Sequence, residues 1–296
     1  MPVIDHRGVL KGLQVEEAMR RQVIQLARQA TLEQAIRHTI KYKVNALLIV
    51  SDEHKAMGVV SKTDLMGAYY AGLPLETPAE AVMVGPPLFC HHDDSLESAL
   101  DIMQTNRVHR LYVWSEVPHQ AVGVLAYPDI LGLLYRYCHR CERARHRSDA
   151  ARGASLKDYL KVGEVMTPGI LAFREDASLS QVMEGLAAYR IGAVLIRSED
   201  ERRAGVVSKT DLIAAYKHGV PVTEPARAVM NFPVQACEQG DFLDIALIQM
   251  ISADVHRLFV YKSRPENLVG VLSLSDVVRF RCGTCRACVT SRIRID

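Results

Sequence analysis

The hydrophobic and polar positions of the chain follow a short pattern that predicts strands and helices in alternation. After the polar Thr31, apolar side chains recur at i, i+3, i+4 and i+7, which predicts a helix with one buried face. That face consists of Leu32, Ala35, Ile36 and Thr39. Short apolar runs at 22–26, 46–50 and 57–60 predict strands, and Leu65, Ala68 and Tyr69 mark a second helix. The predicted order of elements over this segment is β-α-β-β-α.

The same pattern occurs three more times along the chain. In the second copy, Ser95 precedes the helix, and apolar runs at 111–114 and 122–125 predict the paired strands. The buried helical faces predicted in the three further copies are Leu96, Ala99, Leu100 and Met103; Leu179, Val182, Met183 and Leu186; and Leu243, Ala246, Leu247 and Met250. A unit of about 55 residues buries too little surface to be comfortable alone, so we expect the units to pair.

A duplicated segment relates the units to one another. The sequence Gly58-Val-Val-Ser-Lys-Thr-Asp-Leu65 recurs letter for letter at 205–212, an offset of 147 positions, and weaker copies at 123–129 and 270–276 have the same offset. The match runs almost end to end without a gap, so the chain consists of two copies of one fold. The predicted organisation is four units at 15–72, 80–137, 162–219 and 227–281. The remaining segments are 1–14, a basic cysteine-containing linker at 138–161, and a cysteine-rich tail at 282–296.

Composition narrows the class of protein. Of the 296 residues, 49% are hydrophobic and 24% are charged, which is typical of a globular chain. The net charge of +2 provides no global field that would recruit nucleic acid or a membrane. No apolar run approaches the roughly 20 residues that span a bilayer, so we expect a cytoplasmic protein. The basic stretch 136–152 is interpreted as a solvated linker, with a phosphate-rich partner as the alternative.

Several repeated motifs carry a family resemblance. Val-Met pairs begin at 82, 165 and 229, Val-His-Arg-Leu occurs at 108–111 and 255–258, and Gly-apolar-apolar-Ser-x-x-Asp closes three of the units. In the second unit, Ala126 replaces the serine of that motif. The chain resembles a tandem CBS-domain protein with four CBS motifs in two Bateman modules.

The resemblance implies a fold and a function. The fold would be α/β (α+β), with four β-α-β-β-α units paired into two modules. The protein would be regulatory and not an enzyme, and no Ser-His-Asp arrangement, P-loop or H-E-x-x-H motif is evident. It would bind AMP, ADP, ATP or a related adenosyl ligand between paired units and thereby control an unknown protein target. The sequence leaves open whether a disc of four units closes within one chain or whether two chains form a homodimer.

Two carboxylates are the predicted ribose ligands. Ser61 with Asp64, and Ser208 with Asp211, each form a Ser-x-x-acid sequence, which by itself predicts a helix capping box. A carboxylate at a helix start is also well placed to accept hydrogen bonds from ribose hydroxyls. The resemblance implies that Asp64 and Asp211 hold ribose and that Ser61 and Ser208 contact phosphate, which a helix N-terminus favours.

Cationic side chains are the predicted phosphate ligands. A His-Arg pair stands at the start of the middle strand in two units, at His109-Arg110 and at His256-Arg257. Arginine offers a fixed fork of donors to phosphate oxygens. The resemblance implies that the first pair faces Asp64 and that the second faces Asp211. Lys62 and Lys209 are interpreted either as phosphate contacts or as solvated turn lysines.

The complementary clefts are expected to be poorer sites. Their acidic motifs contain Asp129, Ser273 and Asp276. No His-Arg pair would face these residues, because the matching positions, 45–46 and 192–193, hold other residue types, although Lys43 and Arg190 lie nearby. We therefore expect one good nucleotide site per half and two per chain. The base is expected in an apolar slot near Ile24 and Ile170.

The seven cysteines suggest a second kind of site. C-x-x-C spacing occurs in both halves, through Cys138 and Cys141 and through Cys282, Cys285 and Cys288. Two such pairs form a tetrahedral zinc site if the fold brings them together, and C-x-x-C-x-x-C also has iron–sulfur spacing. Reduced thiols on helix ends are the third interpretation. The alternative function is therefore a metal or redox sensor with the CBS units as scaffold. Cys90 and Cys237 are expected to be small core residues.

Overall fold

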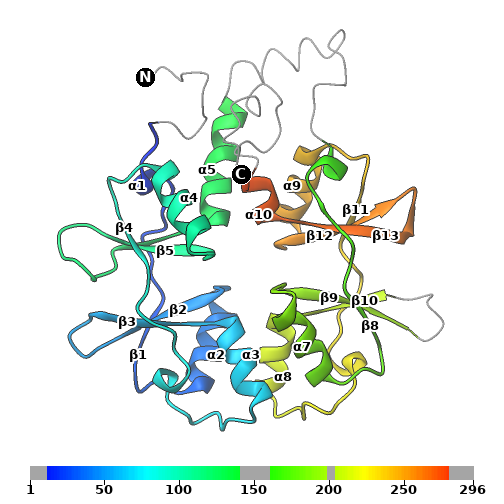
Figure 1. Cartoon of the computed structure of the whole chain (residues 1–296), viewed down its shortest axis with the longest axis horizontal. Coiled ribbons are helices and arrows are strands. Elements are labelled where there is room, and N and C mark those ends of the chain that lie inside the picture. Colours follow the sequence, from blue (N-terminus) through cyan, green and yellow to red (C-terminus); the bar gives the residue numbers. More distant parts are fainter. Residues whose placement is uncertain (1–11, 141–160, 199–203, 280–296) are drawn as a thin grey trace.

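The computed structural model describes residues 12–140, 161–198 and 204–279, and each of the four units has the predicted order of elements (Figure 1). The first unit contains α1 (Val15–Ala18), β1 (Gln25–Ala27), α2 (Leu32–Lys41), β2 (Ala46–Val50), β3 (Ala56–Ser61) and α3 (Lys62–Tyr70). The second contains the 3-10 helix η1 (Ala79–Ala81), β4 (Phe89–His91), α4 (Leu96–Thr105), β5 (Arg110–Trp114), β6 (Gly123–Ala126) and α5 (Tyr127–Arg140).

The second half repeats this arrangement. The third unit contains η3 (Val162–Glu164), β7 (Thr167–Pro168), β8 (Ala172–Arg174), α7 (Leu179–Ala188), β9 (Ala193–Arg197), β10 (Ala204–Ser208) and α8 (Lys209–Lys217). The fourth contains η4 (Ala226–Ala228), β11 (Ala236–Glu238), α9 (Leu243–Ser252), β12 (Arg257–Lys262), β13 (Arg264–Ser273) and α10 (Leu274–Arg279). The α/β fold predicted from the sequence is therefore confirmed.

The predicted helix starts and buried faces are confirmed by the local geometry. Thr31 accepts a hydrogen bond from the Gln34 amide, the Gln34 side chain accepts one from the Thr31 amide, and Ser95 accepts one from the Ser98 amide. Each hydroxyl satisfies one of the amides that a helix start leaves without a partner. All sixteen apolar-face positions predicted in α2, α4, α7 and α9 are buried. The spacing of apolar residues thus determines which side of each helix packs inward.

The sheets share one topology. In each unit the first strand runs parallel to the middle strand, and the middle strand runs antiparallel to the third. The sheet of the fourth unit gains β7 as an edge strand through pairing with β13. In the first half, Arg20 forms the corresponding bridge to Val124 of the second unit. The chain that precedes the first strand of a half therefore lies on the sheet of the following unit.

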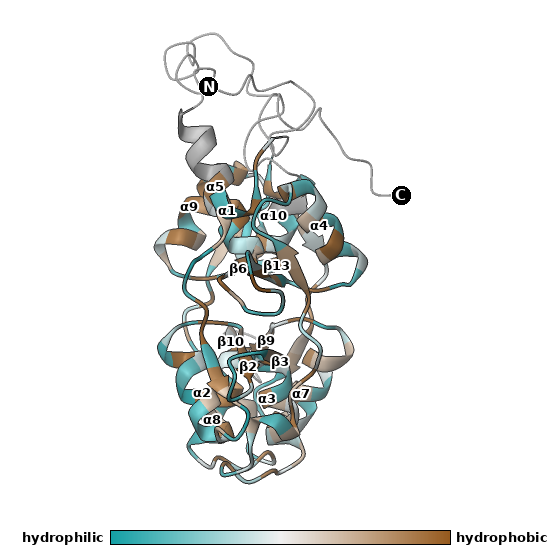
Figure 2. Cartoon of the chain, turned by 90° about the vertical axis from the view of Figure 1, so that its left-hand side faces the viewer, coloured by the Kyte–Doolittle hydropathy of each residue, from teal (hydrophilic) through white to brown (hydrophobic). Residues whose placement is uncertain are grey.

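The apolar core is divided in a way that does not follow the duplication. One cluster joins the first and third units through α2, α3, α7 and α8, and another joins the second and fourth through α5 and α10. Figure 2 shows these as two stacked parts of the molecule. A small cluster of Leu48, Val50, Tyr112 and Val124 joins the first two sheets. The four units close into one assembly within a single chain.

Two further properties of the described residues bear on the predictions. Cys90 and Cys237 are buried in the core of the second and fourth units, as expected. No helix in the described ranges is long and apolar enough to cross a membrane.

Candidate functional site

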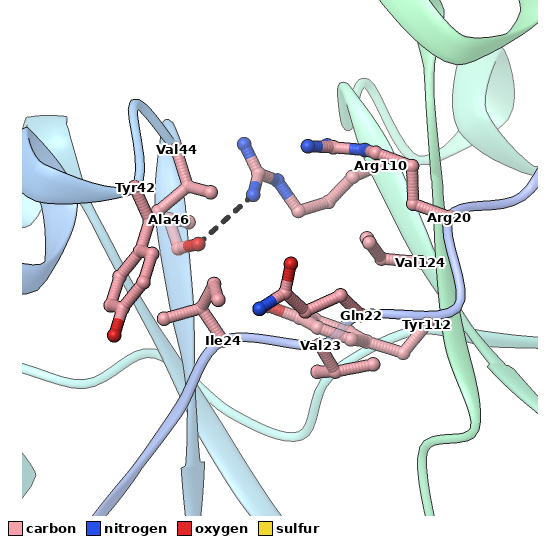
Figure 3. A pocket seen from close by; sticks show the side chains of 10 residues that line it. All are labelled: Arg20, Gln22, Val23, Ile24, Tyr42, Val44, Ala46, Arg110, Tyr112 and Val124. Carbon is pink, nitrogen blue, oxygen red and sulfur yellow. Dashed lines mark hydrogen bonds between the residues drawn. The ribbon is translucent and has the colours of Figure 1, made fainter.

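A pocket lies between the first and second units (Figure 3). Its lining consists of Arg20, Gln22, Val23, Ile24, Tyr42, Val44, Ala46, Arg110, Tyr112 and Val124. Ile24, Val44 and Val124 form apolar walls, while Arg20 and Arg110 bring two guanidinium groups to one side. The pocket contains Ile24, one of the two residues predicted for the base slot. An apolar slot with cations at its edge suits a ligand that has a flat apolar part and an anionic part.

Arg110 is held in this pocket by the strands on both sides of it. As the first residue of β5 it pairs with Ala126 of β6, and its side chain crosses to the first unit, where Nη1 donates to the carbonyl oxygen of Ala46 at 3.1 Å. Burial lowers the pKa of Arg110, and the neighbouring Tyr112 and Asp129 oppose that shift. A guanidinium keeps its proton in proteins, so the pocket retains a partly desolvated positive charge.

Asp129 lies beside the same arginines. Its Oδ2 accepts a hydrogen bond from the Ala126 amide at 2.9 Å, and its Oδ1 lies 2.8 Å from Nε of Arg20. Burial raises the pKa of Asp129, while the positive charges of Arg20 and Arg110 act in the opposite direction. The sequence predicts only that no His-Arg pair of the first unit faces Asp129, and the two arginines that do lie beside it, Arg20 and Arg110, were not predicted. The β5–β6 register places Arg110 opposite the residue that the Asp129 carboxylate caps.

The second half repeats this relation. Arg257 pairs with Ser273 in the β12–β13 ladder, and Ser273 donates to Asp276 Oδ2 from its amide at 2.9 Å and from Oγ at 2.6 Å. Burial lowers the pKa of Arg257 and the charge of Asp276 raises it, so Asp276 also has an arginine of its own unit beside it, which the sequence did not predict. A Cβ atom added to Gly192 would lie 2.4 Å from Nη2 of Arg257, so this guanidinium packs directly on the third-unit backbone.

Asp64 and Asp211 form the capping boxes that the sequence predicts. In each case Oδ2 accepts from the serine amide at 2.7 Å and from the serine hydroxyl at 2.6 Å. The hydroxyls of Ser61 and Ser208 are thus engaged with these carboxylates. The two halves differ at the other oxygen, because Asn231 donates to Oδ1 of Asp211 at 2.8 Å, whereas Val84 occupies the equivalent position in the first half. The Asp211 carboxylate therefore has less capacity for a ligand than that of Asp64.

Cations from both halves converge where the units meet. Lys62 donates to Thr210 Oγ1 at 2.8 Å, and Lys209 donates to Thr63 Oγ1 at 2.8 Å. Burial, Arg110 and Arg257 lower the pKa of Lys62 to about 8, and only Asp211 opposes them. The pKa of Lys209 is likewise lowered by burial and Arg257. These are not ordinary solvated turn lysines, because each is partly buried and lies in a field of like charge.

The other predicted residues occupy varied positions. The ring of His109 lies edge-on to that of Tyr127, with centroids 5.7 Å apart. Burial, followed by Lys62 and Arg257, lowers the pKa of His256. Lys43 forms an ion pair with Asp254 of the fourth unit. Ile170 is the counterpart, 147 positions later, of Val23 in the pocket lining, and Leu171 is the counterpart of Ile24.

The predicted cysteine site falls largely outside the part of the chain that the structure describes. Cys138 belongs to α5, but the structure does not describe its side chain. Cys141, Cys282, Cys285 and Cys288 lie outside the described residues.

Sequence reasoning missed several residues that shape this region. Arg20 gave no motif, although its position just before the first strand, on the sheet of the next unit, explains its contact with Asp129. Asn231 could have been found by comparing the two halves position by position, because it replaces Val84 beside a duplicated acidic motif. The exchanged Lys–Thr hydrogen bonds depend on how the halves pack, and no local pattern indicates them.

Comparisons with known proteins extend this picture. Protein MJ1225 from Methanocaldococcus jannaschii is 21% identical over 199 residues, which are 67% of this chain and 68% of that protein. Its crystal structure, described as that of a proposed archaeal homologue of γ-AMPK, superimposes with a TM-score of 0.72 at 14% identity and covers 90% of this chain and 99% of that one. A conserved protein from Pyrococcus horikoshii has a TM-score of 0.57 at 16% identity, with coverage of 91% and 100%.

A eukaryotic relative is also similar. The γ-3 subunit of 5′-AMP-activated protein kinase from Sus scrofa is 23% identical over 216 residues, 69% of this chain but only 40% of that subunit. The sequence model of the CBS domain matches residues 15–71, 79–136, 162–218 and 226–283, and together with the four observed β-α-β-β-α units it shows that the chain belongs to the CBS-domain family.

Proposed function

We propose that this protein is a non-enzymatic regulatory protein that binds adenine nucleotides between its paired CBS units. The observation that carries the proposal is the convergence of partly buried cations where the four units meet. Arg110 and Arg257, one from each half, both lower the pKa of Lys62. Folded proteins rarely bring like charges together in a desolvated region unless an opposite charge compensates them. Asp129, Asp276 and Asp211 offset part of this positive charge, and a phosphate group of a ligand would offset more of it.

The pocket supports a defined orientation of the ligand. The base would lie against Ile24, Val44 and Val124, and the phosphates would be directed toward Arg110 and onward to Lys62. Asp129 does not itself line the pocket, but its Oδ1 lies 2.8 Å from Nε of Arg20, which does, and ribose hydroxyls would compete with Arg20 for it. Because the Arg20 side chain is 49% exposed, it can move from this carboxylate to a phosphate without disturbing the core.

The comparisons support an adenosine-containing ligand over other anions. The name of the porcine relative assigns it to a kinase that is activated by 5′-AMP, and the chain aligns with 40% of that subunit. A sensor would transmit occupancy to an unidentified protein partner by changing the angle between units. The ligand would shift the equilibrium between two arrangements of the units only if it binds one arrangement more tightly than the other.

Titration calorimetry with AMP, ADP, ATP and S-adenosylmethionine tests the proposal. We expect micromolar binding of at least one of them, which corresponds to about −8 kcal/mol. Hydrogen bonds to a charged group contribute roughly 1.5–3 kcal/mol, so Arg110→Ala should weaken the first-half site about tenfold or more. Arg37→Ala is the matched control, because Arg37 is exposed, pairs with Glu33 and does not line the pocket. Absence of binding by all four compounds would refute the proposal.

Two further variants identify the ribose ligand in the first half. Asp129→Asn should weaken binding if the ligand occupies the pocket of Figure 3. Asp64→Asn should weaken it if the arrangement implied by the CBS resemblance holds instead. If neither variant changes the affinity, adenosine is not recognised through its ribose at this site.

A further inference from the structure

A cluster of potential metal ligands lies at the end of β4, in a part of the second unit that the nucleotide proposal does not use. His91, His92 and Asp93 are consecutive, and one donor atom from each lies within 4.8 Å of the others. His92 Nδ1 is 2.9 Å from Asp93 Oδ1, and His91 Nδ1 is 3.7 Å from Asp93 Oδ2. A fourth group comes from α1, where Oε2 of Glu16 lies 3.8 Å from His92 Nδ1.

The orientation of His91 prepares one ring nitrogen for a metal. Its Nε2 lies 3.1 Å from the carbonyl oxygen of Ser115. A carbonyl only accepts hydrogen bonds, so Nε2 carries the proton and, in the neutral ring, Nδ1 keeps its lone pair. The Asp93 amide donates a hydrogen bond to that lone pair at a long 3.3 Å. Metal-bound histidines are commonly oriented by such a bond from the other ring nitrogen to a backbone carbonyl.

The second half shows that the turn itself does not need these side chains. Asp94 accepts from the His91 amide at 2.7 Å, and Asp241 accepts from the Glu238 amide at 2.8 Å in the equivalent turn. The preceding segment also docks alike in both halves, through Glu16 N to His92 O and through Gly163 N to Gln239 O, each at 3.0 Å. The four candidate ligands Glu16, His91, His92 and Asp93 are nevertheless replaced there by Gly163, Glu238, Gln239 and Gly240. The geometry of the turn is duplicated and its donor groups are not.

We propose that His91, His92, Asp93 and Glu16 form a site for a divalent transition metal of the Zn²⁺ class. Two imidazole nitrogens and two carboxylate oxygens make a donor set that zinc accepts in tetrahedral geometry. Imidazole ligands favour zinc, nickel or copper over calcium and magnesium, which prefer oxygen alone. The imidazoles are 29% exposed, so the ligands remain accessible to solvent.

Such a metal would link two segments that are otherwise joined by backbone hydrogen bonds. Glu16 belongs to the short α1, and the three other ligands follow β4. The chain continues from α1 to Arg20, which pairs with Asp129 beside the pocket. Metal binding would therefore fix the segment that delivers Arg20, which couples this site to the pocket through the protein chain.

Zinc titration of the full-length chain tests the proposal, with the protein free of any histidine tag and first treated with a chelator. Bound Zn²⁺ is measured by competition with a chromophoric chelator, in the wild type and in the variants His92→Gln and Asp93→Asn. Zinc held by the cysteines contributes equally to all of these proteins, so the difference between them reports the proposed site. Gln239→Ala, at the position equivalent to His92, is the matched control. Because metal binding requires deprotonated imidazoles, the measurement belongs above pH 7.

We expect the wild type and Gln239→Ala to bind one more equivalent of Zn²⁺ than His92→Gln. Asp93→Asn should weaken that equivalent about tenfold or more. Asp93 is 57% exposed, so this variant remains informative even if His92→Gln folds poorly. Equal stoichiometry and affinity in the wild type and Asp93→Asn would overturn the proposal, whatever nucleotides do.

Discussion

Lys62 makes a proton-linked prediction that is specific to the proposed nucleotide site. Burial and the charges of Arg110 and Arg257 lower its pKa from 10.5 to about 8. A bound phosphate would neutralise the two guanidinium groups and favour the ammonium form, which returns the pKa toward its ordinary value. Nucleotide binding near pH 8 should therefore draw a proton from the buffer.

The size of this effect follows from the pKa. At pH 8 about half of the free protein carries the Lys62 proton, so binding should take up about 0.5 proton per first-half site. At pH 7 roughly nine-tenths of the free protein already carries it, and the uptake should fall to about 0.1. The ligand does not contribute at pH 8, because the second pKa of a phosphate monoester is about 6. A histidine contributes little there, since its ordinary pKa is about 6.5.

Calorimetry in two buffers with different ionisation enthalpies measures the uptake directly. The observed binding enthalpy at pH 8 should differ between Tris and Hepes by about half the difference in their ionisation enthalpies. Lys62→Met should reduce the difference and leave only the contribution of Lys209, whose pKa is also lowered. Lys55→Met should retain the difference in full, because Lys55 is 71% exposed, pairs with Glu53 and does not line the pocket. If the wild type and Lys62→Met show the same buffer dependence, the proposed contact between phosphate and the central cations is wrong.

Three further predictions concern stability. Between about pH 8 and 10.5 the unfolded chain binds the Lys62 proton more tightly than the folded protein does. The free energy of unfolding of the wild type should therefore rise with pH relative to that of Lys62→Met, by at most about 3 kcal/mol. Denaturant titrations of both proteins across this pH range measure the difference. Leu247→Ala should lower the free energy of unfolding by about 2–5 kcal/mol, because Leu247 is buried. Ile248 is 48% exposed, so Ile248→Ala should lower it by far less, and equal losses would contradict the assigned helix face. Tyr69→Phe removes the hydrogen bond to the Val220 carbonyl between halves and should cost about 1 kcal/mol, with no change expected in its circular dichroism.

The elements were predictable because their signals are local. A helix with one buried face repeats its apolar residues every three or four positions, and the duplication supplied four independent instances of that spacing. The capping boxes at Ser61 and Ser208 were likewise visible, because both partners lie within three residues of each other. The α/β fold and the order of its elements followed from these patterns.

The site was predicted less completely, because its geometry depends on neighbours distant in sequence. Arg110 was assigned toward Asp64, but the β5–β6 register also brings it to Asp129 of its own unit, and that register became visible only in the paired strands. The contact of Arg20 with Asp129 requires the chain before β1 to lie on the sheet of the next unit. Apolar spacing carries no information about either relation.

The division of the apolar core joins units that are distant in sequence. The first and third units share one core, and the second and fourth share another, so each core contains a piece of both duplicated halves. The pocket of Figure 3 lies between the first and second units and therefore between the two cores. In the proposed function, a nucleotide in that pocket would press between the two cores, and a single occupied site would reorient units from both halves at once. Under this proposal, a partner that contacts only the second half would respond to a nucleotide bound in the first.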